Sequence, residues 1–153
     1  MDRPLTVRHG LEIRAATAAD APGLATLLAS AGRAIDARDL AERLVALRHA
    51  PGTALVAVQW GPPSGLVVLH WYPTLGAPRP TAQVTTLLVD PEDRRRGIGR
   101  LLVKAAAQAA RVAGCGELEL LAPPDAPSLH GFCLATGFAE AGLRFTRSLR
   151  KGS

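Results

Sequence analysis

Residues 89–102, VDPEDRRRGIGRLL, place three consecutive arginines directly before a Gly-x-Gly and then become apolar. The β-branched and aliphatic run before them, TAQVTTLLV at 81–89, predicts a strand. The long apolar run after them, at about 97–113, predicts a helix. The motif therefore occupies the turn between a strand and a helix. Taken alone, it indicates a solvated charge cluster, a nucleic-acid patch, or a cradle for a phosphorylated ligand.

The start of the predicted helix favours the phosphate cradle. The first turn of a helix has unpaired N–H groups and the positive end of the helix dipole. Gly97 and Gly99 remove side chains where a ligand would approach the backbone. The neighbouring arginines add positive charge, so we expect a pyrophosphate site. A P-loop is unsupported because no Gly-Lys-Ser/Thr is present, and the third glycine of a dinucleotide fingerprint is missing.

The rest of the chain predicts a mixed α+β order of elements. Thr17 and Asp20 have the spacing of a capping box, and Asp36 is a candidate N-cap for a second helix. The predicted elements before the motif are a strand at 10–17, helices at 18–32 and 37–50, and strands at 53–60, 65–73 and 81–89. Those after the long helix are a strand at 117–123, a short helix at 128–135 and a closing strand or hairpin at 138–149.

Length and composition predict one globular domain over residues 1–153, with short flexible ends at about 1–10 and 150–153. Of the 153 residues, 48% are hydrophobic and 20% charged, an ordinary balance for a packed core. The net charge of +5 favours anionic partners. The start of the chain lacks a signal-peptide pattern and no run is long enough to span a membrane, so we expect a cytoplasmic protein without a membrane partner. Two cysteines and scattered histidines predict no metal site.

At this point the chain resembles a known family. LLVDPEDRRRGIGRLL, at 87–102, resembles the acetyl-CoA-binding motif of the GNAT superfamily of N-acetyltransferases, which reads Arg/Gln-x-x-Gly-x-Gly/Ala. Arg94, Gly97 and Gly99 occupy the defining positions. The later ELELLAP and SLHGFCLATGF resemble the family's next strand, helix and Gly-Phe ending. The resemblance implies a mixed, mostly antiparallel twisted sheet with helices on both faces.

The resemblance also implies a function and a binding site. The function is transfer of an acetyl group from acetyl-CoA to a primary amine of a small molecule or protein, with no metal. Backbone N–H groups of the motif would hold the pyrophosphate, and the preceding strand would pair with pantetheine. The implied cofactor-binding residues are Leu87, Leu88, Val89, Arg94, Arg95, Arg96, Gly97, Ile98, Gly99 and Arg100. Many family members are dimers, so a homodimer is compatible with this resemblance.

The catalytic residues are harder to assign. An alkylamine with a pKa of about 10.4 must lose a proton before it attacks, so a general base is useful. The motif strand offers no base near neutral pH, which leaves His70 on the preceding strand, with Asp90 and Glu140 weaker candidates. Cys133 stands where the family usually has the tyrosine that protonates the leaving thiolate. His70 and Cys133 are the two catalytic candidates, although both residue types are common in protein cores.

Two other functions remain open at this stage. A non-catalytic acyl-CoA-binding module would explain the missing base and tyrosine. A nucleic-acid-binding domain would explain the arginines, but they are dispersed, and aromatic residues make up only 4% of the chain. We therefore expect no nucleic-acid partner.

Overall fold

The computed structural model describes residues 6–8, 10–94 and 97–150. The chain divides into two compact units, Met1–Leu121 and Ala122–Ser153. The predicted site residues Arg95 and Arg96 lie outside the described residues. All the other predicted cofactor residues, and His70, belong to the first unit, whereas Cys133 belongs to the second.

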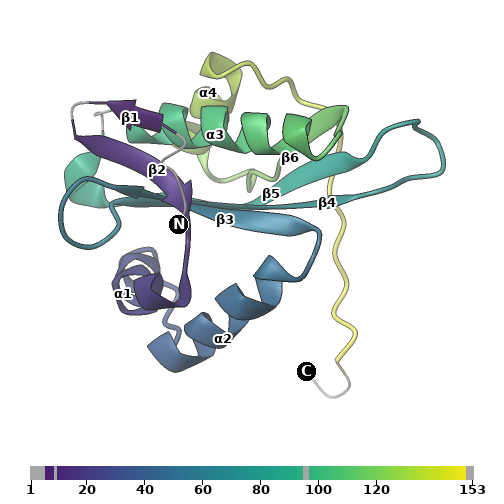
Figure 1. The fold of residues 1–153 in the computed structure, drawn as a ribbon. Coiled ribbons are helices and arrows are strands. Elements are labelled where there is room, and N and C mark those ends of the chain that lie inside the picture. The colour runs from purple at the N-terminus through teal and green to yellow at the C-terminus, as the bar shows by residue number, and fades with distance from the viewer. Residues whose placement is uncertain (1–5, 9, 95–96, 151–153) are drawn as a thin grey trace. The chain divides into compact units, whose positions relative to one another are not determined.

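The first unit is built on a sheet of six described strands that follow one another in chain order (Figure 1). They are β1 (Thr6–Arg8), β2 (Leu11–Ala15), β3 (Gly52–Val58), β4 (Gly65–Tyr72), β5 (Thr81–Val89) and β6 (Glu117–Leu120). Neighbours pair antiparallel from β1 to β5, and β5 and β6 pair in parallel. The mixed, mostly antiparallel sheet predicted from the sequence is confirmed.

Helices cover both faces of this sheet (Figure 1). One face carries α1 (Ala21–Ser30), which follows a single 3-10 turn at Ala18–Asp20, and α2 (Ala37–Arg48). The other face carries α3 (Ile98–Val112). The long parallel crossover from β5 to β6 runs through α3, as a parallel connection requires.

Side chains along each strand point alternately to the two faces of the sheet and pack into two separate cores, one on each face. On the α3 face, Leu69 of β4 packs with Ile98 and Leu102 of the helix. On the opposite face, Val56 of β3 packs with Leu24 of α1 and with α2. Side chains of successive strand residues point to opposite faces, so both cores draw on the same strands. This explains why the runs in β3 and β4 are almost continuously hydrophobic.

An ion pair between Arg14 and Asp20 stabilises the start of α1. Arg14 of β2 donates two hydrogen bonds to the Asp20 carboxylate, both 2.8 Å long. Asp20 also accepts a hydrogen bond from the Thr17 backbone N–H at 2.8 Å, which completes the predicted capping box. The hydrogen bonds from Arg14 hold the pKa of Asp20 below its ordinary value. The carboxylate therefore stays charged and stabilises this corner at neutral pH.

Two parts of the chain differ from the sequence prediction. The short strand β1 was not predicted, because three residues are too few to show a periodic pattern. The closing strand or hairpin predicted at 138–149 is wrong: the second unit contains α4 (Pro127–Ala135), but residues 138–149 form no strand. Leu143 and Phe145 are each 87% exposed. Their alternating pattern is typical of a strand, but a strand also needs backbone groups of a partner beside it.

Gly65, the first residue of β4, controls how closely α3 approaches the sheet. A Cβ at this position would lie 2.9 Å from Leu102 Cδ1 and 3.0 Å from Ile98 Cγ2. Both neighbours are buried, so they have little room to move. We expect Gly65→Ala to lower the free energy of unfolding by about 1–3 kcal/mol through overpacking. Chemical denaturation would measure it, with Gly76→Ala as the control because no atom lies within 4 Å of a Cβ there.

Candidate functional site

The two central strands of the site, β5 and β6, stop pairing halfway along β5. β6 pairs only with Thr81, Ala82, Gln83 and Val84, through Glu117–Leu120. From Thr86 to Val89, β5 pairs with β4 on one side, and no described strand borders its other edge from Thr85 on. Thr85 is an extra residue at this point, since Val68 pairs with Thr86 and Leu69 with Val84. Such a bulge bends the strand, and the open edge presents backbone N–H and C=O groups to a ligand.

The open edge leads directly to the start of α3. Gly97 is the N-cap of this helix in a left-handed conformation (φ 79°), which glycine adopts without strain, and no side chain caps the helix. Its nearby space is open, because nothing lies within 4 Å of a Cβ built there. The Ile98 side chain is buried in the core, so only its backbone faces the turn. The space beside the start of α3, where the first-turn N–H groups of a helix lack intrahelical partners, is therefore open at Gly97, as the phosphate cradle requires.

The arginines of the motif differ in their surroundings. Arg94 directly follows the 3-10 turn Pro91–Asp93 in an extended conformation, is exposed, and makes no hydrogen bond or ion pair with another described residue. Arg100 is exposed in the first turn of α3 and has a polar partner. Leu87 and Val89 pack toward the α3 core, whereas Leu88 packs toward α1 and α2. Their backbone groups, rather than their side chains, are thus the part of β5 that a ligand can reach.

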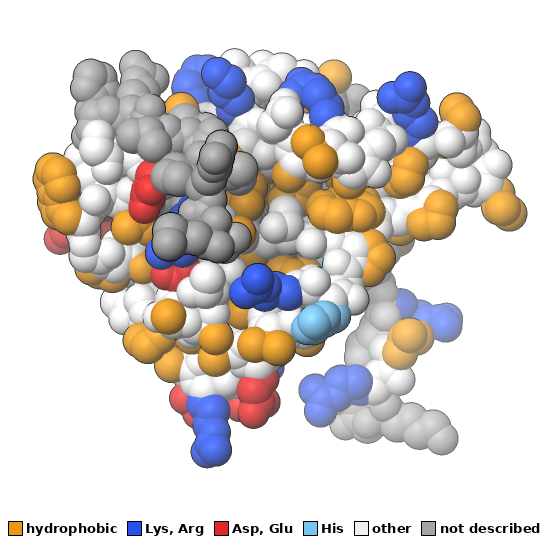
Figure 2. Space-filling view, in the orientation of Figure 1, with side chains coloured by type: hydrophobic (Ala, Val, Ile, Leu, Met, Phe, Trp, Pro, Cys, Tyr) orange, Lys and Arg blue, Asp and Glu red, His pale blue; other side chains and the backbone are white. Residues whose placement is uncertain are grey.

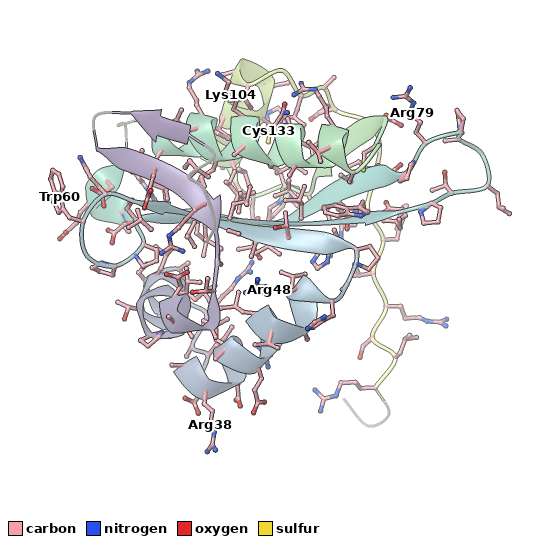
Figure 3. The ribbon with its side chains drawn as sticks, in the orientation of Figure 1. Arg38, Arg48, Trp60, Arg79, Lys104 and Cys133 are labelled. Atoms are coloured by element: carbon pink, nitrogen blue, oxygen red, sulfur yellow. The ribbon has the colours of Figure 1, made fainter. Side chains whose placement is uncertain are left out.

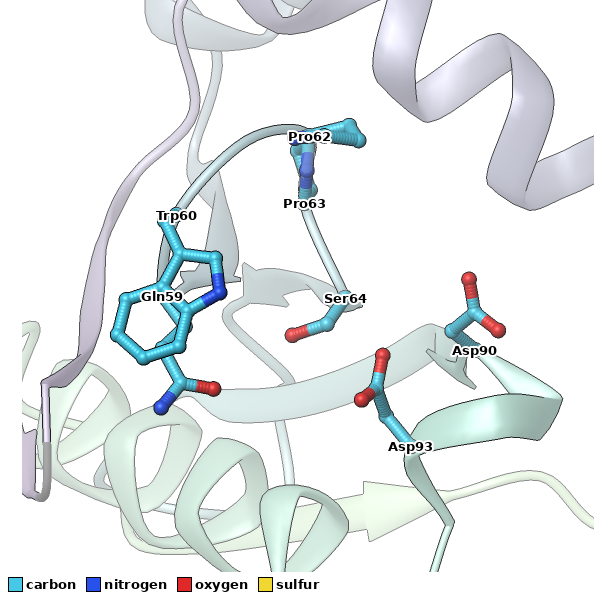
Figure 4. Close-up of a pocket in the computed structure, with 7 residues that line it drawn as sticks. All are labelled: Gln59, Trp60, Pro62, Pro63, Ser64, Asp90 and Asp93. Atoms are coloured by element: carbon cyan, nitrogen blue, oxygen red, sulfur yellow. The ribbon is translucent and has the colours of Figure 1, made fainter.

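The loop between β3 and β4 holds the turn in front of α3. The Asp90 backbone N–H donates to the Ser64 carbonyl at 2.8 Å, and the Asp90 carboxylate accepts a bond from the Glu92 backbone N–H at 2.9 Å. A cavity of about 230 Å³ lies between this turn and the β3–β4 loop (Figure 4). Its lining includes Trp60, which is 78% exposed, and the carboxylates of Asp90 and Asp93. Its two carboxylates disfavour a bound phosphate, so the cavity lends no support to the cradle.

A polar cluster lies on the sheet face opposite α3, one residue before the strands diverge. Glu119 of β6 accepts hydrogen bonds from the Tyr72 hydroxyl at 3.2 Å and from Gln83 Nε2 at 3.4 Å. Partial burial, and then the hydrogen bond to Glu119, raise the pKa of Tyr72, so the phenol stays protonated and donates. His70, predicted as a base, lies opposite Gln83 on the same face. The structure thus brings His70 and Glu119 onto one surface beside the open edge of β5.

The sequence analysis did not single out Glu119 as a candidate. Its segment ELEL alternates acidic and apolar residues, which is typical of an ordinary half-exposed strand. The signal that could have found it is the parallel pairing of this strand with the motif strand, which places a carboxylate beside Gln83. Of the weaker base candidates, Asp90 is engaged in the turn before α3, and Glu140 lies 2.6 Å from His130 Nε2 in the second unit.

Cys133 lies on α4 in the second unit and is partly exposed (Figure 3). Burial raises the pKa of its thiol, so the group stays protonated at neutral pH. A protonated thiol can give a proton to a thiolate of similar basicity. The Cys133 carbonyl also accepts the Phe138 N–H at 2.9 Å, which closes the end of the helix.

Two further properties concern the whole described chain. None of its helices is both long and apolar enough to cross a membrane. Within the same residues, no three His, Cys, Asp or Glu side chains are grouped to hold a metal ion. Lys and Arg side chains on the face shown in Figure 2 lie apart over several elements of the first unit instead of forming one patch.

Comparison with known proteins identifies the family. Residues 23–138 match the model of the acetyltransferase (GNAT) family, and the matched region includes residues of both units. The chain therefore belongs to the GNAT acetyltransferase family, and the resemblance seen in its sequence is confirmed. No curated protein matches the chain in sequence.

Solved structures of acetyltransferases share the fold. A presumed acetyltransferase from Agrobacterium tumefaciens str. C58 is 28% identical, with a TM-score of 0.80 over 89% of this chain and 98% of that one. An aminoglycoside acetyltransferase from an uncultured soil metagenomic sample, in complex with sisomicin, is 22% identical, with a TM-score of 0.77 over 92% and 97%. A ribosomal-protein-alanine N-acetyltransferase from Brucella melitensis biovar Abortus 2308 is 24% identical, with a TM-score of 0.77 over 92% and 99%. At these identities the last two show the fold alone.

We expect Arg94→Ala to weaken CoA binding about tenfold, because one exposed charge-assisted contact to phosphate is lost. Isothermal titration calorimetry with CoA would measure the change. Arg111→Ala is the matched control, since Arg111 is an exposed arginine at the opposite end of α3 and its loss changes the net charge equally. Equal affinities of the Arg94→Ala variant and the unmodified protein would contradict the cradle.

Proposed function

We propose that this protein transfers an acetyl group from acetyl-CoA to a primary amine by direct transfer. The observation that carries the proposal is the open edge of β5, from Thr85 to Val89, leading into the uncapped start of α3. The family supplies the reaction type. The polar cluster around Glu119 lies beside the point where the strands diverge, which is where the reacting carbonyl would be held.

The chain would hold acetyl-CoA mainly through its backbone. The N–H groups of Ile98, Gly99 and Arg100 would bind the diphosphate, assisted by the Arg94 guanidinium. The open edge of β5 would pair with the amides of pantetheine as an added strand does. These groups fit the donor because they offer N–H groups and open space at Gly97 together with a free strand edge.

The transfer forms one bond and breaks one. The nitrogen lone pair of the amine attacks the thioester carbonyl carbon, a C–N bond forms, and the C–S bond breaks with its electron pair on sulfur. The amine loses one proton and the leaving thiolate gains one, so the products are an amide and free CoA. The protein must therefore supply a proton acceptor on the acceptor side and a proton donor near sulfur.

Glu119 is the proposed proton acceptor, directly or through water, with His70, two strands away on the same face of the sheet, as the second candidate. Glu119 keeps its carboxylate directed by two donors, Tyr72 and Gln83, at the row just before the strands separate. Cys133 is the proposed proton donor, since its raised pKa keeps the thiol protonated. The acceptor is a small molecule or a protein amine; structures of both kinds of acetyltransferase, an aminoglycoside enzyme and a ribosomal-protein enzyme, share this fold.

A coupled assay that detects free CoA, run with acetyl-CoA over a panel of amines, tests the function. Amine-dependent release of CoA, together with acetylated products by mass spectrometry, would support it. CoA binding without release for any amine would contradict it and favour an acyl-CoA-binding module.

We expect Glu119→Gln to lower kcat by about 100-fold near neutral pH, the smaller end of the range for general bases. The affinity for CoA should not change, because the cradle lies at the other end of the open edge of β5. The deficit should shrink as pH approaches the amine pKa of about 10.4, where the acceptor loses its proton unaided. Rate profiles against pH would measure this.

Glu117→Gln is the matched control for that variant, since Glu117 is exposed on the same strand and points to the same face two residues away. A control variant with the same loss, or a deficit in Glu119→Gln that does not depend on pH, would remove Glu119 from the proton transfer.

We expect Cys133→Ala to slow turnover while CoA affinity stays nearly constant, because the proton donor to the thiolate is lost. Leu134→Ala, an exposed neighbour on α4, serves as the control. If kcat of Cys133→Ala matches that of the unmodified protein across the pH range, Cys133 takes no part in the chemistry.

A further inference from the structure

One transverse row of residues crosses four strands on the face of the sheet opposite α3. Gly52 of β3 is the partner of His70, His70 is the partner of Gln83, and Gln83 is the partner of Glu119. Residues directly opposite one another in a sheet point to the same face. The hydrogen bond between Gln83 and Glu119 confirms this for the last pair.

Gly52, the first residue of this row, leaves one end of the row without a side chain. A Cβ on Gly52 would lie 2.7 Å from the Leu69 carbonyl oxygen, 3.2 Å from His70 Nδ1 and 3.2 Å from Leu47 Cδ1. The imidazole of His70 and the side chain of Leu47 in α2 therefore both lie close to the bare backbone of Gly52. A side chain at this position would be too close to the Leu69 carbonyl oxygen, so something would have to shift.

A pocket of about 210 Å³ begins at Gly52 and extends between α2 and the ends of β2 and β3. Its walls are mostly aliphatic, with Ala16, Leu44 and Ala54 buried, and Thr53 also lines it. Arg48, in the last turn of α2, also lines the pocket, and Figure 3 shows it between this helix and the sheet. Arg48 is exposed and makes no hydrogen bond or ion pair with another described residue, so its guanidinium is available to a ligand.

The two ends of the row thus have opposite charges. The Glu119 carboxylate stands at the end beside the diverging strands, and the Arg48 guanidinium lies at the pocket beyond Gly52. Three strand spacings separate Gly52 from Glu119, about 14 Å, and two separate His70 from Glu119, about 10 Å. A ligand that matches this surface has a cationic group at one end, a short apolar chain, and an anionic group about 10–14 Å away.

We infer that the acceptor is an aminocarboxylate: its primary amine lies at Glu119, beside the reacting carbonyl, and its carboxylate binds Arg48. This inference rests on the proposed function and adds the chemical class of the acceptor. Arg48 is a specificity-determining residue that acts on binding of the acceptor and takes no part in proton transfer. The aliphatic pocket between α2 and β3 receives the carbon chain next to the carboxylate.

The test uses three amines of matched length: ω-aminooctanoate, its amide, and octylamine. Turnover is followed by release of CoA, and binding of ω-aminooctanoate is measured by calorimetry in the presence of CoA. We expect the carboxylate to lower KM relative to the amide. We expect Arg48→Gln to raise the KM for ω-aminooctanoate about tenfold, as for one partly exposed charge-assisted contact, with kcat nearly constant. The KM for octylamine should not change.

Arg38→Gln is the matched control, because Arg38 is an exposed arginine at the opposite end of α2 and points away from the sheet (Figure 3). Arg48→Glu provides a second variant, expected to shift preference from ω-aminooctanoate to octanediamine. Similar KM values for the carboxylate and its amide, or equal effects of Arg48→Gln and Arg38→Gln, would overturn the inference while the transferase function stands. If no amine releases CoA, the proposed function fails, and calorimetry decides separately whether Arg48 binds the carboxylate.

Discussion

The divergence of β5 and β6 is the constraint on which the candidate site depends. Parallel pairing ends at Val84 and Leu120, and the extra residue Thr85 bends β5 at the same point. Backbone groups that a continuous sheet would satisfy internally are left for a ligand from there to Val89. Because α3 begins only a short turn later, the free N–H groups at its start extend the same polar surface. The break in strand pairing and the start of α3 thus form one continuous polar surface, which is the proposed donor site.

Close packing keeps these two halves aligned. Gly65 lets Ile98 and Leu102 pack against the start of β4, so the first turns of α3 lie directly on the sheet. The hydrogen bond from Asp90 to Ser64 ties the intervening turn to the neighbouring loop. A helix N-terminus attracts an anion only within its first turn, so its position must be fixed relative to the strand edge. In the proposed site, the buried contacts would therefore fix the position of the ligand as well as stabilise the fold.

The sequence predicted features that depend on neighbouring residues and missed those that depend on strand register. The motif at 89–102 and the capping box at Thr17 are local patterns, and the structure has the expected strand, turn and helix there. Glu119 could not be found in this way, because its relation to Gln83 and Tyr72 exists only once β6 lies beside β5. The error at 138–149 has the same cause: alternation is local, whereas strand formation depends on a partner.

Donor and acceptor recognition rest on different parts of the chain in the proposed reaction. The donor would be held by backbone groups at the strand divergence and the helix start, which many side chains permit. The acceptor would be held by side chains in one row across the sheet, where His70 and Gln83 are only partly buried. A substitution of His70, Gln83 or Glu119 changes charge or shape without disturbing either core, so it costs little folding free energy. Such a division allows acceptor specificity to change while the fold and the donor site are retained.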